Sequence, residues 1–150
     1  MKLSNSEEGR RLLVLGARQY VKVDAQDSGG GCAVIEQISP VGSAVPLHVH
    51  EREDEIFHVL AGRVSVETDG RTAIAGVGAT IFLPRRIPHG FSVVGDLPAR
   101  LLIVVSPAGL EGMFSELDRL PPGPPDFAKV TEICGRFGVR FVETSSRPAA

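Results

Sequence analysis

Short stretches rich in β-forming residues, each followed by a turn signal, dominate the sequence between residues 18 and 107. Val, Ile, Leu, Phe and Thr fill these stretches, and steps such as Gly-Gly-Gly, Ala-Gly and Asp-Gly separate them. Residues 63–67 alternate between polar and apolar, as in a half-exposed strand, whereas residues 101–105 are continuously apolar and are expected to be buried on both faces. Many short strands at this spacing predict an antiparallel sandwich or barrel and argue against a parallel α/β sheet. Strands are expected at residues 20–24, 32–39, 45–50, 55–60, 63–68, 72–75, 80–83, 90–94 and 100–106.

The C-terminal part of the sequence changes to a helical pattern. Leu, Met and Phe recur at helical spacing over residues 110–120, which predicts an amphipathic helix of about three turns. A Pro-Pro-Gly-Pro-Pro linker ends this helix, and Asp126 stands at the N-cap of a second one. The first helix can either cover the mouth of the barrel or pack on its outer surface. The remaining expected elements are a short helix at residues 127–134, a strand at 138–142 and a polar tail from residue 143.

One domain with two extensions accounts for the whole pattern. A length of 150 residues suits a single domain and is enough to bury a hydrophobic core. Residues 1–17 are expected to form an N-terminal arm or an added edge strand. Residues 18–107 are expected to form the barrel, and residues 108–150 a helical extension and tail.

Three of the four histidines fall into one arrangement with a glutamate. Because alternate residues of a strand share a face, His48 and His50 can aim at one point. Glu55 would face away from that point in an unbroken strand, but the polar residues 51–54 form a natural turn that resets the facing. The spacing therefore predicts a strand, a turn and a strand whose side chains converge, with His89 from a distant strand, on one divalent metal ion.

The residues around His48-Val-His50 resemble the first motif of the cupin superfamily, G-x5-H-x-H-x3or4-E-x6-G. Every fixed position of that motif is filled from Gly42 to Gly62. These two glycines, like Gly78, are expected to allow turns with positive φ. The resemblance implies the cupin fold, a double-stranded β-helix jelly-roll barrel. The run Pro-Leu-His-Val-His and residues 106–112 are most similar to small single-domain cupins named after quercetin dioxygenase.

A second cupin motif, G-x5-P-x-G-x2-H-x3-N, is partly matched further along the chain. The sequence keeps its first glycine at Gly78, its proline at Pro84 and its histidine at His89. Arg86 replaces the second glycine and Val93 replaces the asparagine. Neither replaced position is a ligand in the family, so the resemblance still implies a metal bound by the first-motif residues and His89.

Neighbouring polar residues offer alternatives to this set. Asp54 is the rival carboxylate, since the family also allows a three-residue gap, but only Glu55 keeps the six-residue step to Gly62. His58 lies three residues after Glu55 and is expected on the opposite face, at the surface. Solvated side chains are expected for Glu51, Glu53, Arg85 and Arg86.

The predicted ligand set suggests what chemistry the chain can support. Three imidazoles and one carboxylate without thiolate suit Fe(II), Mn(II), Ni(II), Co(II) or Zn(II) and do not choose among them. By resemblance to the quercetinase-like cupins, the first hypothesis is a dioxygenase that cleaves an enol, catechol or flavonol-like small molecule. His48, His50, Glu55 and His89 would then hold the metal, and Glu55 would also act as the catalytic base that takes the hydroxyl proton of the substrate.

Two other functional classes fit the same residues. One is a non-catalytic cupin that binds or senses a small ligand. The other is a non-oxidative isomerase or lyase in which the metal acts only as a Lewis acid. A substrate pocket within the barrel is compatible with all three hypotheses. The apolar residues expected to line the interior are Phe57, Val59, Phe82, Phe91, Ile103 and Val105.

Composition narrows the partners and the compartment. A net charge of −2 and a pI near 6.1 give no reason to expect nucleic acid or an acidic membrane as a partner. The longest N-terminal apolar run, residues 12–15, is too short for a signal-peptide core or a membrane span, which favours the cytoplasm. Cys32 and Cys134 form no metal or redox motif and are expected to be reduced. The family resemblance implies a homodimer.

Overall fold

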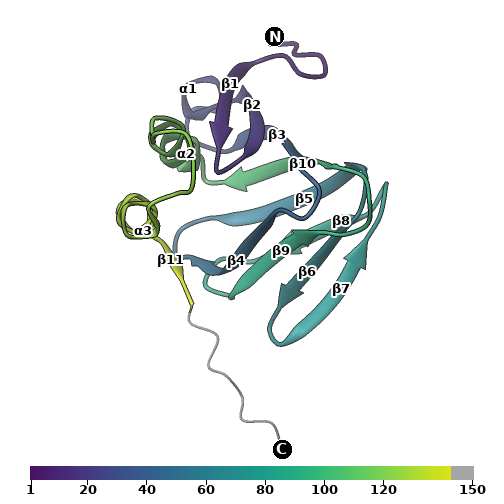
Figure 1. The fold of residues 1–150 in the computed structure, drawn as a ribbon. Coiled ribbons are helices and arrows are strands. Elements are labelled where there is room, and N and C mark those ends of the chain that lie inside the picture. Colours follow the sequence, from purple (N-terminus) through teal and green to yellow (C-terminus); the bar gives the residue numbers. More distant parts are fainter. Residues whose placement is uncertain (143–150) are drawn as a thin grey trace, which may run out of the picture.

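The structure, a computed structural model, describes residues 1–142 and is built mostly of antiparallel strands (Figure 1). The tail predicted from residue 143 lies outside the described residues. The helices are α1 (Ala25–Ser28), α2 (Leu110–Asp118) and α3 (Phe127–Arg136). The strands are β1 (Arg10–Val14), β2 (Ala17–Val23), β3 (Ala33–Ser39), β4 (Ala44–His50), β5 (Asp54–Ala61), β6 (Val64–Thr68), β7 (Arg71–Ala75), β8 (Thr80–Leu83), β9 (His89–Val93), β10 (Ala99–Ser106) and β11 (Val139–Phe141).

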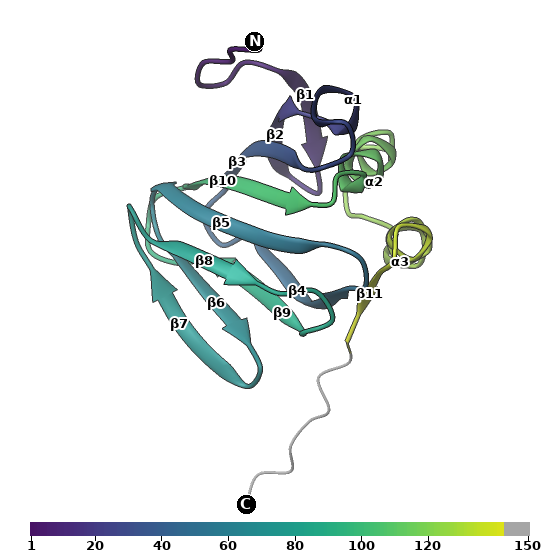
Figure 2. The same cartoon turned by 180° about the vertical axis from the view of Figure 1, so that it is seen from behind.

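Two sheets form the body of the molecule, as Figure 2 shows from behind. The six-stranded sheet has the order β1-β2-β3-β10-β5-β8, and the five-stranded sheet has the order β11-β4-β9-β6-β7. Every pairing between neighbours is antiparallel. The predicted all-β class is therefore confirmed, and consecutive strands repeatedly change sheet, as in a jelly roll.

The N-terminal segment joins the six-stranded sheet at its edge. β1 pairs with β2 and buries Leu12 and Val14, and α2 packs against it. The short helix α1, which the sequence pattern did not predict, begins at a capping box. The Asp24 side chain accepts from the backbone N–H of Asp27, and the Asp27 side chain accepts from the backbone N–H of Asp24.

The core lies between the inner faces of the two sheets, and the interior residues were predicted correctly with one exception. Phe82 is 60% exposed, whereas the other five apolar residues expected inside are buried. The register explains this difference: Leu83 and Ile81 lie opposite the inward-facing Glu55 and Phe57, so Phe82 must face outward. The strand expected to be buried on both faces, residues 101–105, alternates between buried and half-buried side chains.

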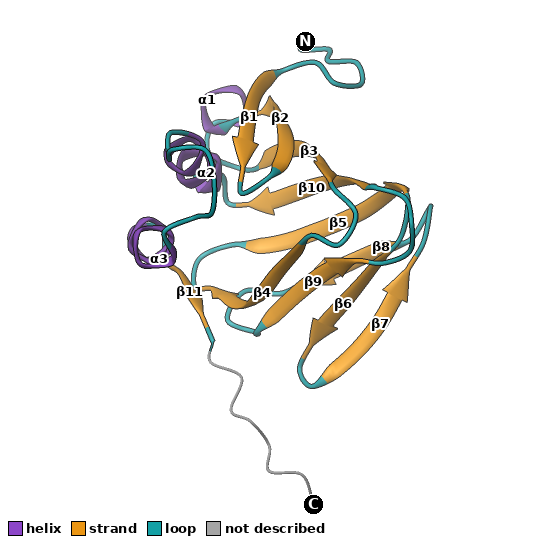
Figure 3. Cartoon of the chain, viewed as in Figure 1, coloured by secondary structure: helices purple, strands orange, loops and turns teal. Residues whose placement is uncertain are grey.

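The helices gather on one side of the molecule (Figure 3). α2 packs on β1 and on α3, and α3 packs on β11. Among residues 1–142 there is no helix with the length and apolar character needed to cross a membrane.

The motif glycines lie in turns whose backbone conformation is energetically unfavourable for other residues. Gly42, Gly62 and Gly78 have φ values of 75°, 71° and 87°, as predicted. Gly62 is also closely packed, because an added Cβ would lie 2.4 Å from the carbonyl oxygen of Pro98. Nothing lies within 4 Å of the corresponding position at Gly78. Gly62 is therefore needed for packing as well as for backbone conformation.

Alanine substitutions at Gly62 and Gly78 separate the free-energy cost of the backbone conformation from the cost of close packing. We expect Gly78→Ala to lower the free energy of unfolding by about 1–2 kcal/mol, the cost of a left-handed residue. Gly62→Ala should lower it by a further ~1–3 kcal/mol, because the Pro98 backbone must also move. Urea denaturation of both variants measures this difference. Equal losses would show that the contact with Pro98 relaxes freely.

Candidate metal centre

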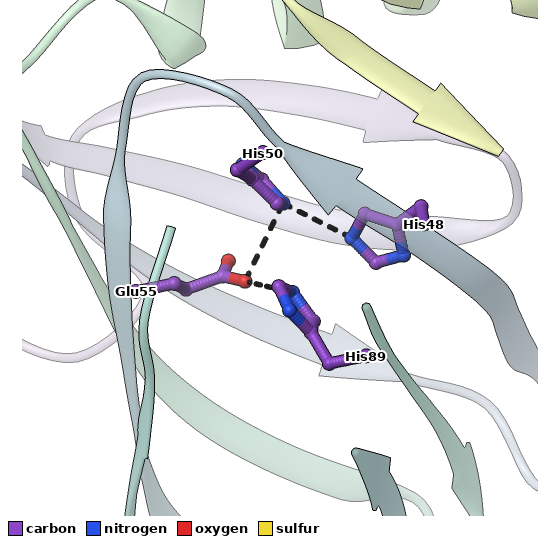
Figure 4. Close-up of side chains that lie close together, drawn as sticks. All are labelled: His48, His50, Glu55 and His89. Atoms are coloured by element: carbon purple, nitrogen blue, oxygen red, sulfur yellow. Dashed lines mark hydrogen bonds and ion pairs between the residues drawn. The ribbon is translucent and has the colours of Figure 1, made fainter. Parts of the chain in front are cut away.

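The predicted ligands come from both sheets and meet between them. His48 and His50 lie on β4, and His89, the first residue of β9, lies directly opposite His48 in the five-stranded sheet. Residues 51–53 then carry the chain across to the six-stranded sheet, where Glu55 lies on β5. The predicted turn thus does more than reset the facing of Glu55, because it brings the carboxylate from the opposite sheet. Figure 4 shows the four side chains pointing toward one another.

Gly90 lets β4 and β9 approach closely beside the histidines. A Cβ added at Gly90 would lie 2.8 Å from the carbonyl oxygen of Val45 and 3.1 Å from the backbone nitrogen of Leu47. A larger residue would push the two strands apart. The facing of His48 and His89 therefore depends on the absence of a side chain at this position.

Four ligand atoms surround one small buried space. The Nε2 atoms of His48 and His50 are 3.0 Å apart, and Nε2 of His89 is 3.2 Å from Oε2 of Glu55. The same Glu55 oxygen is 3.7 Å from Nε2 of His50. One ligand atom from each residue lies within 4.8 Å of all the others, and all four side chains are buried. The cluster can therefore hold one metal ion.

Backbone carbonyls orient two of the imidazoles. Nδ1 of His48 is 2.8 Å from the carbonyl oxygen of Pro46, and Nδ1 of His89 is 3.2 Å from that of Ile87. Because a carbonyl oxygen only accepts hydrogen bonds, each Nδ1 carries a proton. Nε2 of His48 can therefore present its lone pair to the centre, as a metal-binding histidine does. Nε2 of His89 lies against the carboxylate of Glu55, so a metal would have to replace the proton of that contact.

The electrostatics of the cluster favour the protonation states of metal ligands. Burial, followed by the nearby His50 and His89, lowers the pKa of His48 to about 4, so this imidazole is neutral at pH 7. Burial alone would raise the pKa of Glu55. The hydrogen bond from His89 and the nearby His50 and His89 imidazoles outweigh burial and hold that pKa below its usual value. Glu55 is therefore an ionised carboxylate.

The donor set fits a divalent cation. With a lone pair on Nε2 of His48, the contact of 3.0 Å to Nε2 of His50 requires a proton or a cation between them. A divalent ion would take the place of that proton and would also compensate the buried carboxylate of Glu55. The nitrogen and oxygen donors suit the same first-row ions that the sequence indicated.

Glu53 also lies beside this cluster, although it was predicted to be solvated. Its side chain is buried, with Oε2 3.7 Å from Nδ1 of His50. Neither atom has a hydrogen-bond partner among the described residues. Burial lowers the pKa of His50, but Glu53 and Glu55 outweigh it and raise that pKa above its usual value. The prediction for Glu53 was wrong because the turn after β4 buries this side chain. Its carboxylate faces Nδ1 of His50, the ring nitrogen that points away from the cluster.

The rival residues lie away from the cluster. The carboxylate of Asp54 accepts from the backbone N–H of Arg85 at 2.9 Å and from its guanidinium at 2.8 Å. His58 contacts Oγ1 of Thr80 instead, at 2.8 Å. Of the predicted carboxylates, Glu55 is thus the one that faces the three imidazoles.

Arg86 explains one departure from the second motif. Its φ of 66° is the left-handed conformation that glycine adopts most easily. Its backbone N–H donates to the carbonyl oxygen of His50 at 2.8 Å, which fixes the loop between β8 and β9 against the end of β4. The loop therefore keeps the glycine-type backbone although arginine occupies the position. The Arg85 and Arg86 side chains are both exposed, as predicted, and Arg85 is paired with Asp54.

A cavity of about 340 Å³ extends from the cluster and is walled mainly by apolar side chains. His48, His50 and Glu55 form part of its lining. Helices α2 and α3 contribute to the same wall, so the C-terminal extension covers the cavity from one side. Sequence periodicity marked these helical residues as apolar but could not tell which surface they cover. Prominent wall residues are Phe57, Phe91, Met113, Phe114, Phe127 and Phe141.

Comparisons with known proteins agree with this geometry. The family model described as "Cupin domain" matches residues 34–105, a segment that contains all four clustered side chains. An uncharacterized protein of Methanocaldococcus jannaschii, MJ1618, is 34% identical over 70 residues, which are 47% of this chain and 56% of that protein. The polyketide synthase CurC of Streptomyces cyaneus is 28% identical over 88 residues, 59% of this chain and 57% of CurC. The chain thus spans a little over half the length of these two relatives.

Two further proteins carry names that bear on chemistry. Quercetin 2,3-dioxygenase of Bacillus subtilis is 25% identical over 112 residues, which are 75% of this chain but only 33% of that enzyme. Among solved structures, the polyketide cyclase RemF of Streptomyces resistomycificus superposes with a TM-score of 0.60 and 27% identity. That superposition covers 71% of this chain and 79% of RemF.

Divalent metal should bind at the cluster and stabilise the fold. At free metal a hundredfold above Kd, linkage predicts about 2.7 kcal/mol of stabilisation and a rise in Tm of roughly 5–10 °C. The double variant His48→Ala/His50→Ala should lose both this rise and the metal found by elemental analysis. His58→Ala is the matched control and should retain both. Metal retained by the double variant would place the binding site elsewhere.

Asp54 should titrate as the outward-facing partner of Arg85. The side-chain and backbone hydrogen bonds from Arg85 lower the pKa of Asp54 to about 2. A lowered pKa means that the interaction stabilises the fold above pH ~4 and is lost as the pH falls toward 2. NMR titration should show this midpoint in the wild type and a midpoint nearer 3.8, the ordinary value, in Arg85→Ala. An unchanged midpoint would contradict the pairing.

Proposed function

Because the chain belongs to the cupin superfamily, we propose that it is a metal-dependent enzyme that acts on an apolar, enolisable or phenolic small molecule. The observation that carries this proposal is the position of the His48, His50 and Glu55 side chains in the wall of the apolar cavity. A volume of about 340 Å³ is at the lower end of the range for small-molecule pockets. The cavity therefore suits a compact ring system and not a polymer or a peptide.

His48, His50, Glu55 and His89 would hold the ion, which is Fe(II), Mn(II), Ni(II), Co(II) or Zn(II). When bound, the ion supplies Lewis acidity toward an enol or phenol oxygen and, if it is redox-active, a route to O₂ chemistry. The apolar side chains of the cavity wall would displace water around a bound substrate and so strengthen electrostatic interactions near the ligands.

Glu55 would have a second role as a general base. Its ionised carboxylate lines the cavity, so it can accept the hydroxyl proton of an enol or phenol at Oε2. Without a metal, an N–H at Nε2 of His89 occupies the same oxygen, and a bound ion would take the place of that proton. The substrate would thereby lose its proton to Glu55 and become an anionic enolate.

An enolate can then react in two ways, and each reaction is supported by the similarity to a different group of proteins. The similarity to quercetin 2,3-dioxygenase supports oxidative cleavage, in which the enolate reacts with O₂. The similarity to CurC and RemF, named as a polyketide synthase and a polyketide cyclase, supports a non-oxidative cyclisation. Proton transfer to Glu55 is common to both reactions, so O₂ dependence distinguishes them. The homodimer expected from the family resemblance stays a prediction.

Consumption of simple enols tests the proposed function. Protein loaded separately with each of the five metals should convert either 3-hydroxyflavone, which O₂ cleaves, or 2′-hydroxychalcone, whose phenolate closes the flavanone ring without an oxidant. Absorbance and an oxygen electrode monitor both reactions. Conversion with O₂ uptake that stops under argon supports the dioxygenase, and conversion that continues under argon supports the cyclase-type reaction. Metal-dependent binding of both compounds without conversion would instead support the non-catalytic, ligand-binding cupin.

Glu55→Gln should separate metal binding from proton transfer. The neutral amide binds metal more weakly and cannot accept a proton, so turnover should fall by about 10²–10⁴-fold even with metal in excess. Asp54→Asn is the matched control, because the carboxylate of Asp54 is bound to Arg85 outside the cluster. Its turnover should stay close to wild type. Full activity in metal-saturated Glu55→Gln would reject the role of Glu55 as a base.

A further inference from the structure

A strip of polar side chains interrupts the apolar wall of the cavity. Gln19 on β2 and Gln37 and Ser39 on β3 line the cavity and are nearly fully buried, with exposures of 1%, 6% and 1%. Gln19 and Gln37 lie opposite each other in the sheet. Nε2 of Gln19 donates to Oε1 of Gln37 at 2.7 Å, and Nε2 of Gln37 donates to Oγ of Ser39 at 2.9 Å. We call these three residues the glutamine strip.

The fold does not require polar side chains at these positions. The next inward-facing pair along the same two strands, Val21 and Ile35, is apolar and buried. Buried amides are costly unless they are hydrogen-bonded, and an apolar pair would avoid that cost. The glutamine strip therefore calls for an explanation other than packing.

One end of the glutamine strip is unsatisfied. Oε1 of Gln19 is buried and has no hydrogen-bond partner among the described residues. If both amides were rotated, the chain of hydrogen bonds would run in the opposite direction and leave a donor of Gln19 free instead. A hydroxyl group satisfies either case, because it both donates and accepts.

Strand register places the glutamine strip and Glu55 on one inner surface. Gln37 pairs with Leu101 of β10, which pairs with Val59 of β5, and the inward-facing Glu55 lies four residues before Val59. Two strand spacings and four residues correspond to about 16 Å between the Cα atoms of Gln37 and Glu55. Both side chains line the same cavity. A molecule held at the metal centre can thus extend toward the glutamine strip.

The charges of the cavity restrict what can bind there. Among residues 1–142, its lining contains neither lysine, arginine nor aspartate, and the one acidic residue there, Glu55, belongs to the metal centre. A carboxylate or ammonium group at the glutamine strip would therefore be buried without a counter-charge. The group that fits is neutral and forms hydrogen bonds.

We infer that the glutamine strip is a specificity subsite that binds a neutral hydroxyl group at the end of the substrate remote from the metal-binding oxygens. This inference rests on the proposed function, since it takes the enol oxygens to be held at the metal centre. It predicts that the substrate carries a second polar group, which an apolar ring system separates from the enol. Gln19 supplies the terminal hydrogen bond, and Gln37 and Ser39 hold its amide in place.

Two flavones that differ by one hydroxyl test the subsite. 3-Hydroxyflavone has the chelating oxygens alone, and 3,4′-dihydroxyflavone adds a phenol at the far end of the molecule. Titration of Zn(II)-loaded wild-type protein under argon, followed by absorbance, should give a Kd two- to tenfold lower for the dihydroxy compound, the range for one neutral hydrogen bond. In Gln19→Met, which keeps the side-chain length, that preference should disappear, so that the ratio of the two Kd values falls to about one.

Gln26→Met is the matched control, because Gln26 is exposed on α1 and does not line the cavity. It should bind both flavones as the wild type does. The same preference in wild type and Gln19→Met would overturn the subsite, and so would equal affinity of the wild type for the two compounds.

A second measurement needs neither metal nor a variant enzyme. In metal-free wild-type protein, phenol at millimolar concentration should shift the side-chain amide NMR signals of Gln19 and Gln37, and benzene should not. Phenol-specific shifts together with no binding of either flavone would support the subsite and reject the proposed function. Flavone binding without phenol-specific shifts at these amides would support the proposed function and reject the subsite.

Discussion

The close antiparallel contact between β4 and β9 is the interaction on which the candidate site depends. Gly90 allows this approach, and the resulting register sets His48 opposite His89. A slip of one residue would turn each histidine of the moved strand to the outer face of the sheet. The crossing at residues 51–53 then adds Glu55 from the other sheet. Three imidazoles and a carboxylate are thus assembled by backbone pairing before any ion binds.

The sequence predicted the parts of this arrangement that depend on local spacing. Strand positions, the motif glycines and the convergence of His48 and His50 follow from alternation and turn chemistry, which act over a few residues. Alternation gives the facing of a side chain within its strand but not the sheet that the strand joins. That is why the crossing before Glu55, the burial of Glu53 and the outward facing of Phe82 emerged only from the structure.

Hydrophobic periodicity had a similar limit in the C-terminal extension. It identified the buried stripe of α2, where Leu110, Met113 and Leu117 are all buried. Residues on one face of a helix recur every three to four positions, so the stripe can be recognised in the sequence. It could not distinguish packing against the barrel from enclosing a cavity, since both bury the same stripe. The glutamine strip was missed for the opposite reason: isolated polar residues within a strand give no periodic signal.

Within the described part of the chain, more than half of the residues that line the cavity lie outside residues 34–105, the segment matched by the cupin model. They belong to β1, β2 and the turn between them, and to α2, α3, β11 and the linker before α3. The four clustered residues and more than half of the cavity wall therefore come from separate stretches of the sequence. Substitutions in the flanking stretches can therefore reshape the cavity without disturbing the four clustered residues.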